Sequence, residues 1–264
     1  CGQIALNRAG IKYDNYFASE IKKHAIKVTQ HNYPDTIQVG DVTKIKAEDL
    51  PKIDLLIGGS PCQDFSSANK ERLGLKGEKS SLFFEYVRLL NELKPKYFLL
   101  ENVSMDDYSY QFISETLGTY PVNINSELVS GQLRQRSYWT NIGAESFDLF
   151  GNRYCMIPQP KNKNIKLKDI LESGNVDRDK STCILARYKT SATRNFLSMS
   201  NRAKKGFTTI VYEKDTFRLF TTKELERLQT VPEGYVDNVP GISENMKSNL
   251  LGDGWTIDVI AHIF

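Results

Sequence analysis

The stretch IDLLIGGSPCQ at residues 53–63 joins a short apolar run to a turn that carries a cysteine. The run is typical of a buried strand, because Leu and Ile residues are followed directly by two glycines. Cys62 comes after Pro61, outside the apolar run in which a core cysteine would normally sit. The stretch therefore predicts a sheet strand with a thiol held at its carboxyl end.

Outward from this strand, apolar runs alternate with helix-like segments through residues 1–142. This alternation predicts an α/β fold, with a doubly wound, mostly parallel sheet covered by helices on both faces. Ligands of such sheets bind outside the carboxyl ends of the strands. We expect strands at residues 15–18, 36–39, 53–58, 97–100, 122–129 and 138–142, and helices at residues 3–9, 21–31, 81–93 and 110–117.

The pattern weakens after residue 143 and divides the chain into three predicted parts. Residues 1–144 form the α/β domain, residues 145–207 a small, basic and irregular lobe, and residues 208–264 return to the α/β domain. A helix follows Cys1 at once, so a first strand is expected to be missing ahead of it. Later regular structure is expected at residues 208–212, 222–229, 245–251 and 256–263, with a capping-box start at residues 221–224.

The composition is that of a soluble globular protein: 264 residues, 40% hydrophobic, 25% charged, with a formal net charge of +3. Low-complexity, collagen-like and disulfide-framework proteins are excluded. Cys1, Cys62, Cys155 and Cys183 are widely spaced and are interpreted as reduced thiols of a cytoplasmic protein, without a metal site. We expect no membrane span and no secretory leader.

The small net charge conceals a basic stretch at residues 161–205. It holds 12 Lys and Arg residues against four acidic residues. Such a stretch indicates contact with a polyanion, since neutralised phosphates release counterions. A solvated surface explains the charge alone equally well.

Acidic residues follow two early strands. Glu20 comes after residues 15–18, and Asp41 after residues 36–39. Carboxylates in these positions bind the ribose hydroxyls and the adenine amine of nucleotide-like cofactors. Helix capping is the more frequent use of such acids, so the two residues alone are a weak signal.

A third group of polar residues completes the pattern at the strand ends. Glu101 follows the apolar strand at residues 97–100, and Arg134 and Arg136 lie on one face of an extended segment. A thiolate such as that of Cys62 needs a nearby cation or a helix N-terminus to favour ionisation. A buried cysteine, a capping glutamate and a surface arginine pair are the structural alternatives. The order of Cys62, Glu101 and the arginine pair, and their placement at strand ends, make it improbable that all three structural alternatives apply at once.

Pro61-Cys62-Gln63, Glu101-Asn102-Val103 and Gln132-x-Arg134-x-Arg136 resemble, in this order, the motifs of DNA cytosine-5 methyltransferases. Residues 18–21, 40–42, 225–232 and 249–255 resemble further motifs of that family. Residues 82–86, 121–130 and 251–255 resemble the de novo-type branch with its prokaryotic and phage relatives. Asp253-Gly254 departs from the usual Arg-Ser or Asn-Ser, and Asp64-Phe65 from the usual Gly-Phe.

The resemblance implies a Rossmann-like, class I methyltransferase that uses S-adenosylmethionine and releases S-adenosylhomocysteine. Its substrate would be a cytosine flipped out of a specific sequence of double-stranded DNA. Cys62 would add to C6, Glu101 would bind N3, Arg136 would hold O2, and Arg134 would order the site. The implied cofactor residues are Cys1, Gly2, Glu20, Ile21, Asp41, Val42, Ser60, Leu82 and Trp255; the implied DNA contacts, in the loop after Cys62 and in a target-recognition region at 145–207, are Ser66, Asn69, Arg187, Lys189, Arg194, Lys204 and Lys205.

Three other functions stay open. A tRNA cytosine-5 methyltransferase would use the same scaffold and chemistry. A catalytically inactive, DNA-binding regulatory relative would usually lack one of Cys62, Glu101, Arg134 and Arg136. A methyltransferase acting on a small metabolite would not need the basic lobe. A homodimer and a cognate restriction endonuclease are also open as partners, in the cytoplasm of a prokaryotic or phage-infected cell.

Overall fold

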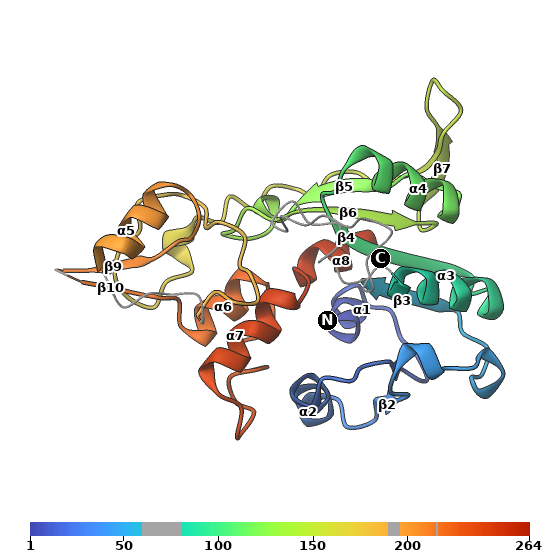
Figure 1. The fold of residues 1–264 in the computed structure, drawn as a ribbon, viewed down its shortest axis with the longest axis horizontal. Coiled ribbons are helices and arrows are strands. Elements are labelled where there is room, and N and C mark those ends of the chain that lie inside the picture. Colours follow the sequence, from blue (N-terminus) through green and yellow to red (C-terminus); the bar gives the residue numbers. More distant parts are fainter. Residues whose placement is uncertain (60–80, 190–195, 215) are drawn as a thin grey trace.

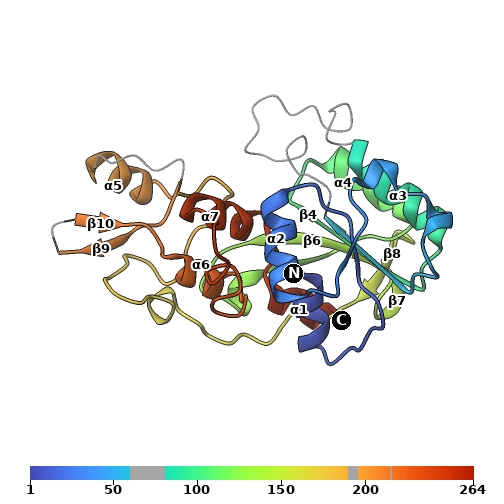
Figure 2. The same cartoon turned by 90° about the horizontal axis from the view of Figure 1, so that it is seen from below.

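The computed structural model describes residues 1–59, 81–189, 196–214 and 216–264. Figures 1 and 2 both show an elongated molecule with a mixed α/β part at one end and a smaller lobe at the other. The lobe carries α5 (Phe196–Lys204), β9 (Val211–Glu213) and β10 (Thr216–Arg218). Helices α6 (Thr222–Leu228) and α7 (Glu244–Asp253) lie between the two parts (Figure 1).

All six strands and all four helices expected before residue 143 are confirmed, with bounds that shift by a few residues. Later helices are confirmed as α6, α7 and α8 (Ile257–Ile263), and α6 begins with the expected capping box of Thr221 and Glu224. No described helix is long and apolar enough to cross a membrane. The elements of the first part are α1 (Gly2–Arg8), β1 (Phe17–Ala18), α2 (Lys23–Asn32), β2 (Ile37–Gln38), β3 (Leu55–Gly59), α3 (Ser81–Leu93), β4 (Tyr97–Val103), α4 (Asp107–Leu117), β5 (Val122–Asn125) and β6 (Gln135–Thr140).

The described strands do not form the single, mostly parallel sheet that the sequence predicts. β1 and β2 make a parallel two-stranded sheet, and a separate four-stranded sheet has the order β3-β4-β6-β5. Within it only β3 and β4 are parallel; β6 runs antiparallel to both its neighbours. β1 and β3 belong to separate sheets, and Phe17 of β1 and Leu55 of β3 both line one cleft.

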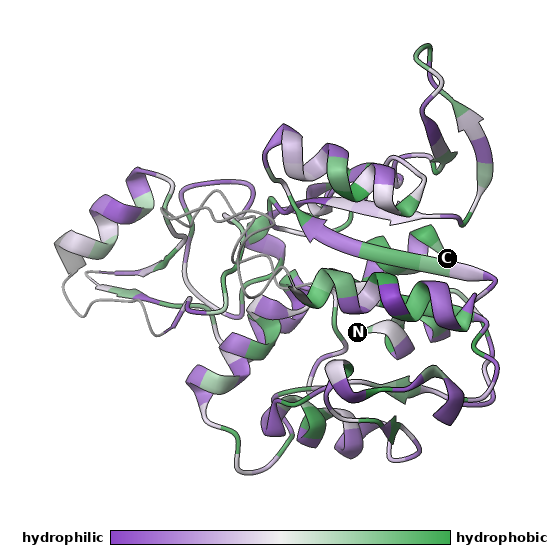
Figure 3. Ribbon diagram, turned by 45° about the vertical axis from the view of Figure 1, so that its right-hand side comes forward, coloured by the Kyte–Doolittle hydropathy of each residue, from purple (hydrophilic) through white to green (hydrophobic). Residues whose placement is uncertain are grey.

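Helices cover both faces of the four-stranded sheet, as expected. Successive side chains of β4 point to opposite faces, so Phe98 and Leu100 pack with α3 and α4, while Leu99 packs with α1 and α8. Figure 3 shows the central strand changing from hydrophobic to hydrophilic toward its carboxyl end. The apolar part of β4 therefore anchors the strand, and its polar end is left to form a site.

The segment expected to be irregular, at residues 145–207, contains regular structure that the sequence did not reveal. A hairpin of β7 (Ala144–Phe147) and β8 (Arg153–Met156) projects at the end of the molecule opposite α5 (Figure 1). It lies beside β5, where Tyr120 donates its N–H to the Arg153 carbonyl at 2.7 Å. Its turn is made by the Asp148 carboxylate, which accepts two backbone N–H groups, and by Gly151 with φ of 81°. The hairpin was missed because local turn chemistry of this kind carries no hydrophobic periodicity.

Candidate active site

Glu101 and Arg136 meet at the edge of the four-stranded sheet where β3 and β4 end and β6 begins. Glu101 lies near the end of β4 opposite Gly59 of β3, and Arg136 lies on β6 opposite Val103. The Nε atom of Arg136 is 2.9 Å from Oε1 of Glu101, and the two side chains are 12% and 11% exposed. Two residues that the sequence predicts as catalytic therefore form a nearly buried ion pair.

The charge of Arg136 is stabilised by its surroundings. Burial tends to lower the pKa of the guanidinium, but the Glu101 carboxylate and the Cys183 thiol outweigh it, and the net shift is upward. Nη1 also donates to the Gln135 carbonyl at 2.6 Å. A fixed cation and a fixed carboxylate thus lie side by side, with little water to screen them.

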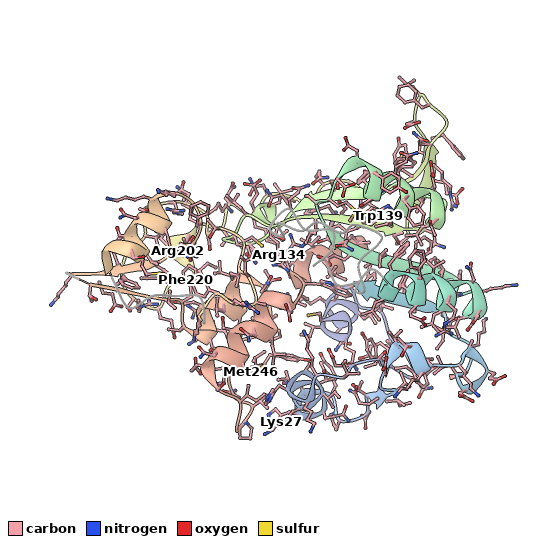
Figure 4. The ribbon with its side chains drawn as sticks, in the orientation of Figure 1. Lys27, Arg134, Trp139, Arg202, Phe220 and Met246 are labelled. Atoms are coloured by element: carbon pink, nitrogen blue, oxygen red, sulfur yellow. The ribbon has the colours of Figure 1, made fainter. Side chains whose placement is uncertain are left out.

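Arg134 has a different position, although it is only two residues away. Its side chain is buried, and Nη2 donates to the Gly254 carbonyl at 2.8 Å and to that of Gly252 at 3.4 Å. Nη1 donates to the Ile184 carbonyl at 3.1 Å. Figure 4 places Arg134 at the junction between the lobe and the α/β part. Arg134 therefore ties the lobe to the end of α7, and this contact geometry is that of a positioning residue.

A cleft of about 1120 Å³ runs along β3, from Leu55 at the start of the strand to Gly59 at its carboxyl end, and β1 contributes Phe17 to its lining. Its lining includes five of the nine predicted cofactor residues, together with Phe17, Gly58 and Gly59. Gly2 lies under Tyr16, and a side chain at position 2 would collide with the Tyr16 hydroxyl. The five lining residues are Glu20, Ile21, Asp41, Val42 and Leu82.

The two acids of this cleft are held by their own neighbours. Oε1 of Glu20 accepts the N–H groups of Ile21 and Lys22, each at 2.8 Å. Asp41 accepts from the backbone N–H of Thr43 at 3.0 Å and from its hydroxyl at 2.9 Å. These bonds lower the pKa of Asp41 below its ordinary value. Each acid binds local N–H groups and also lines the cleft, so the two uses are compatible.

Gly59 connects the cleft to the ion pair. A Cβ atom at this position would lie 3.2 Å from Nε1 of Trp255 and 3.4 Å from Oε2 of Glu101. Trp255 follows α7, whose last carbonyls are bound by Arg134. The absence of a side chain at Gly59 therefore brings the cofactor-side and catalytic-side residues of the prediction together.

The basic stretch exposes less charge than its composition indicates. Lys180 donates to the carbonyls of Glu127, Ser130 and Ile165, so it braces the interior. Lys189 pairs with Glu244 at 2.8 Å, and its side chain is only 13% exposed. Of the predicted DNA contacts, the structure exposes Arg187, Lys204 and Lys205.

Five predicted site residues lie outside the described part of the chain: Ser60, Cys62, Ser66, Asn69 and Arg194. One residue near the site was missed by the sequence analysis. The Sγ atom of Cys183 accepts from Arg134 at 3.3 Å and from Arg136 at 3.7 Å. No sequence signal distinguishes it from the other cysteines, because its neighbours in the site come from a distant strand.

Comparison with known proteins matches residues 1–106 to the C-5 cytosine-specific DNA methylase family. The type II methyltransferase M.NgoBV of Neisseria gonorrhoeae is 36% identical over 188 residues, which cover 64% of this chain and 42% of that protein. M1.ScrFI of Lactococcus lactis subsp. cremoris is 31% identical over 257 residues, covering 85% and 65%. The orphan methyltransferase M.SPRI of Bacillus phage SPR is 35% identical over 185 residues, covering 65% and 40%.

Among solved structures, the S. pombe Dnmt2 methyltransferase aligns with a TM-score of 0.68 at 18% identity. The alignment covers 99% of this chain and 93% of that one. At this identity the likeness establishes the fold. The chain spans 40% to 65% of the length of the curated relatives named above.

Proposed function

The chain belongs to the C-5 cytosine-specific DNA methyltransferase family, and from this premise we propose that it transfers a methyl group to C5 of cytosine in a specific duplex DNA sequence. The observation that carries the proposal is the nearly buried Glu101–Arg136 pair beside Gly59 and Trp255. A pre-formed cation and carboxylate at the sheet edge can bind the polar edge of a base and stabilise charge that develops on it.

In this proposal Cys62 is the nucleophile. Its thiolate forms a bond from Sγ to C6 of cytosine, and the ring electrons move toward C5 and N3. Glu101 hydrogen-bonds N3 and the exocyclic amine, and Arg136 holds O2. After methylation, loss of the C5 proton restores the C5–C6 double bond and expels the thiolate. Arg134 acts indirectly, by fixing the chain on both sides of the site.

The cleft fits S-adenosylmethionine, which supplies an electrophilic methyl group when it is bound. Glu20 and Asp41 offer carboxylates for the ribose hydroxyls and the adenine amine, and Ile21, Val42 and Leu82 offer apolar contacts for the adenine ring. The low pKa of Asp41 keeps this acceptor ionised at neutral pH. In this proposal Trp255 covers the methionine side of the cofactor, since its Nε1 atom lies beside Gly59, which lines the cleft.

DNA is bound by the lobe in this proposal. The exposed side chains of Lys204 and Lys205 contact phosphates, and residues 145–207 include the target-recognition region. A cytosine inside a stacked duplex does not reach Glu101, so the base is flipped out. We also infer that the two described sheets are parts of one doubly wound, Rossmann-like sheet. A homodimer, a cognate endonuclease and a cytoplasmic location stay predictions from the sequence.

The test is transfer of labelled methyl from S-adenosylmethionine to duplex DNA, to tRNA and to no acceptor, with base-resolution mapping of the product. We expect label at C5 of cytosine within one short DNA sequence. Label in tRNA alone would assign the protein to the RNA-methylating alternative. No transfer despite measured cofactor binding would contradict the proposed activity and favour a regulatory role.

The matched variant is Cys62→Ser. It should abolish methyl transfer and leave DNA binding intact, because a serine hydroxyl is far less ionised than a thiol at neutral pH. Cys155→Ser is the control, since Cys155 is buried on β8, at the end of the molecule away from the lobe. Turnover retained by Cys62→Ser would overturn the covalent mechanism.

A further inference from the structure

Leu185 is an exposed apolar side chain that directly follows Ile184, whose carbonyl is bound by Arg134. Its side chain is 57% exposed, whereas its neighbours Ile184 and Tyr188 are 1% and 8% exposed. Cys183, two residues earlier, lies within 3.3 Å of Arg134 and 3.7 Å of Arg136. Leu185 therefore directly follows a segment that contacts both arginines of the site.

Single exposed leucines are common on protein surfaces, but the backbone before Leu185 is unusually well fixed. Segment 181–184 runs beside segment 131–134: Ser181 donates its N–H to the Gly131 carbonyl at 2.7 Å, and Leu133 donates to the Ser181 carbonyl at 2.8 Å. Nη1 of Arg134 then binds the Ile184 carbonyl at 3.1 Å.

The backbone after Leu185 is fixed as well. The Leu185 carbonyl accepts the N–H of Tyr188 at 3.0 Å, and the Tyr188 hydroxyl donates to the Thr209 carbonyl at 2.8 Å. Gly252 of α7 packs so closely that a Cβ atom there would lie 2.5 Å from the carbonyl carbon of Leu185. The backbone of Leu185 is thus fixed by hydrogen bonds and close packing on both sides.

Flipping a base out of a duplex leaves a gap in the stack and exposes an orphaned partner. Some DNA-binding proteins insert apolar side chains between base steps, and the cost of flipping is lowest where the target is already mismatched. We propose that Leu185 is a wedge that enters the duplex at the place vacated by the target cytosine. This inference rests on the proposed function and adds a positioning residue to it.

Phe207 is the nearest rival in the lobe. It is 68% exposed and follows Lys204 and Lys205, so it is well placed to add to DNA affinity. However, Phe207 lies beyond α5, and no described contact links it to Arg134 or Arg136. It therefore serves as a comparison variant that tests DNA binding without base flipping.

The experiment first maps the methylated sequence on plasmid DNA and then uses a short duplex that contains it. Single-turnover methylation by Leu185→Ala is measured on a paired target cytosine and on the same cytosine opposite an abasic site. We expect a roughly tenfold loss on the paired target and recovery to within about twofold of wild type on the abasic one. Leu185→Met should keep most of the wild-type rate on both duplexes.

Two controls separate this effect from general damage. Leu149→Ala removes a fully exposed leucine at the tip of the β7–β8 hairpin and should leave both rates unchanged. Phe207→Ala should weaken binding of both duplexes equally. An equal loss by Leu185→Ala on both duplexes, or no loss on either, would overturn the wedge. Wild-type protein that methylates no duplex would instead overturn the proposed function, and the wedge with it.

Discussion

The carboxyl end of the four-stranded sheet and the basic lobe both carry charged side chains, but they hold them differently. At the sheet end, Glu101 and Arg136 are nearly buried and paired at 2.9 Å. In the lobe, Lys204 and Lys205 are exposed, and Lys166 and Asp179 form a surface pair whose side chains are 50% and 73% exposed. A buried charged pair keeps a fixed geometry and is weakly screened by water, so it can stabilise charge on a reacting base. Exposed charged side chains change conformation easily and can bind the phosphates of a polyanion.

The first prediction breaks the buried pair. Glu101→Gln keeps the shape of the side chain but removes the charge that faces Arg136. We expect methyl transfer to fall by about two to three orders of magnitude, because the group that supports charge on the base is lost. The single-turnover rate at saturating DNA and cofactor measures this loss.

The control for Glu101→Gln is Glu145→Gln, which removes the exposed partner of Arg153 on the β7–β8 hairpin. Exposed pairs contribute little, so we expect a rate within about twofold of wild type and almost unchanged stability. If both variants lost the same activity, the contrast between buried and exposed charge would be wrong.

The second prediction concerns Arg134, which joins the two regions. Arg134→Ala leaves the carbonyls of Ile184, Gly252 and Gly254 without their charged donor. We expect about 3 kcal/mol of destabilisation, measured by denaturant unfolding. Affinity for S-adenosylmethionine should fall as well, since the chain that carries Trp255 loses its support. Arg134→Lys should restore part of the stability. Unchanged cofactor affinity in a destabilised Arg134→Ala would restrict Arg134 to folding.

The order of strands and helices up to residue 143 was predictable because each element carries its own apolar period. Ser81–Leu93 was expected with its actual bounds, since its apolar residues repeat at helical spacing. The motif order also pointed to Glu101 and Arg136 as neighbours, although the sequence offered no geometry for their contact.

What could not be predicted depends on contacts between distant segments. The separation of β1 from β3 is not encoded in either strand alone, and the position of Cys183 follows from the pairing of segment 181–184 with segment 131–134. The charge of the lobe was overestimated for the same reason. Lys180 and Lys189 counted as basic surface in the sequence, but carbonyls and Glu244 bind their ammonium groups in the fold.

The third prediction distinguishes exposed lysines of the lobe from lysines whose charge is already paired. Lys204→Ala with Lys205→Ala should weaken DNA binding and reduce the slope of log K against log salt by about 2, since each phosphate contact contributes about 0.9. Lys189→Ala is the matched control, because its ammonium already pairs with Glu244. It should leave the slope unchanged. An unchanged slope in the double variant would show that this part of the lobe does not contact phosphate.

The fourth and smallest effect is a pH dependence at Glu244, which links the lobe to α6 and α7. Burial tends to raise the pKa of Glu244, but hydrogen bonds from Lys189, Lys247 and Thr222 outweigh it and lower the pKa to about 2. The unfolded chain protonates this carboxyl near its ordinary value of 4.5. The stabilisation is therefore complete above pH 4.5 and is lost as the pH falls toward 2.

Because the Glu244 side chain is 58% exposed, solvent screening limits the contribution to about 1 kcal/mol or less. Glu244→Gln should lower the unfolding free energy slightly at pH 7 and flatten its decline between pH 4.5 and 2. Glu48→Gln is the control, since its surface pair with Lys46 at 3.8 Å is 70% and 76% exposed. An equal flattening in both variants would contradict this prediction. It would mean that Glu244, in the contact between the lobe and α7, stabilises the fold no more than an exposed carboxylate such as Glu48 does.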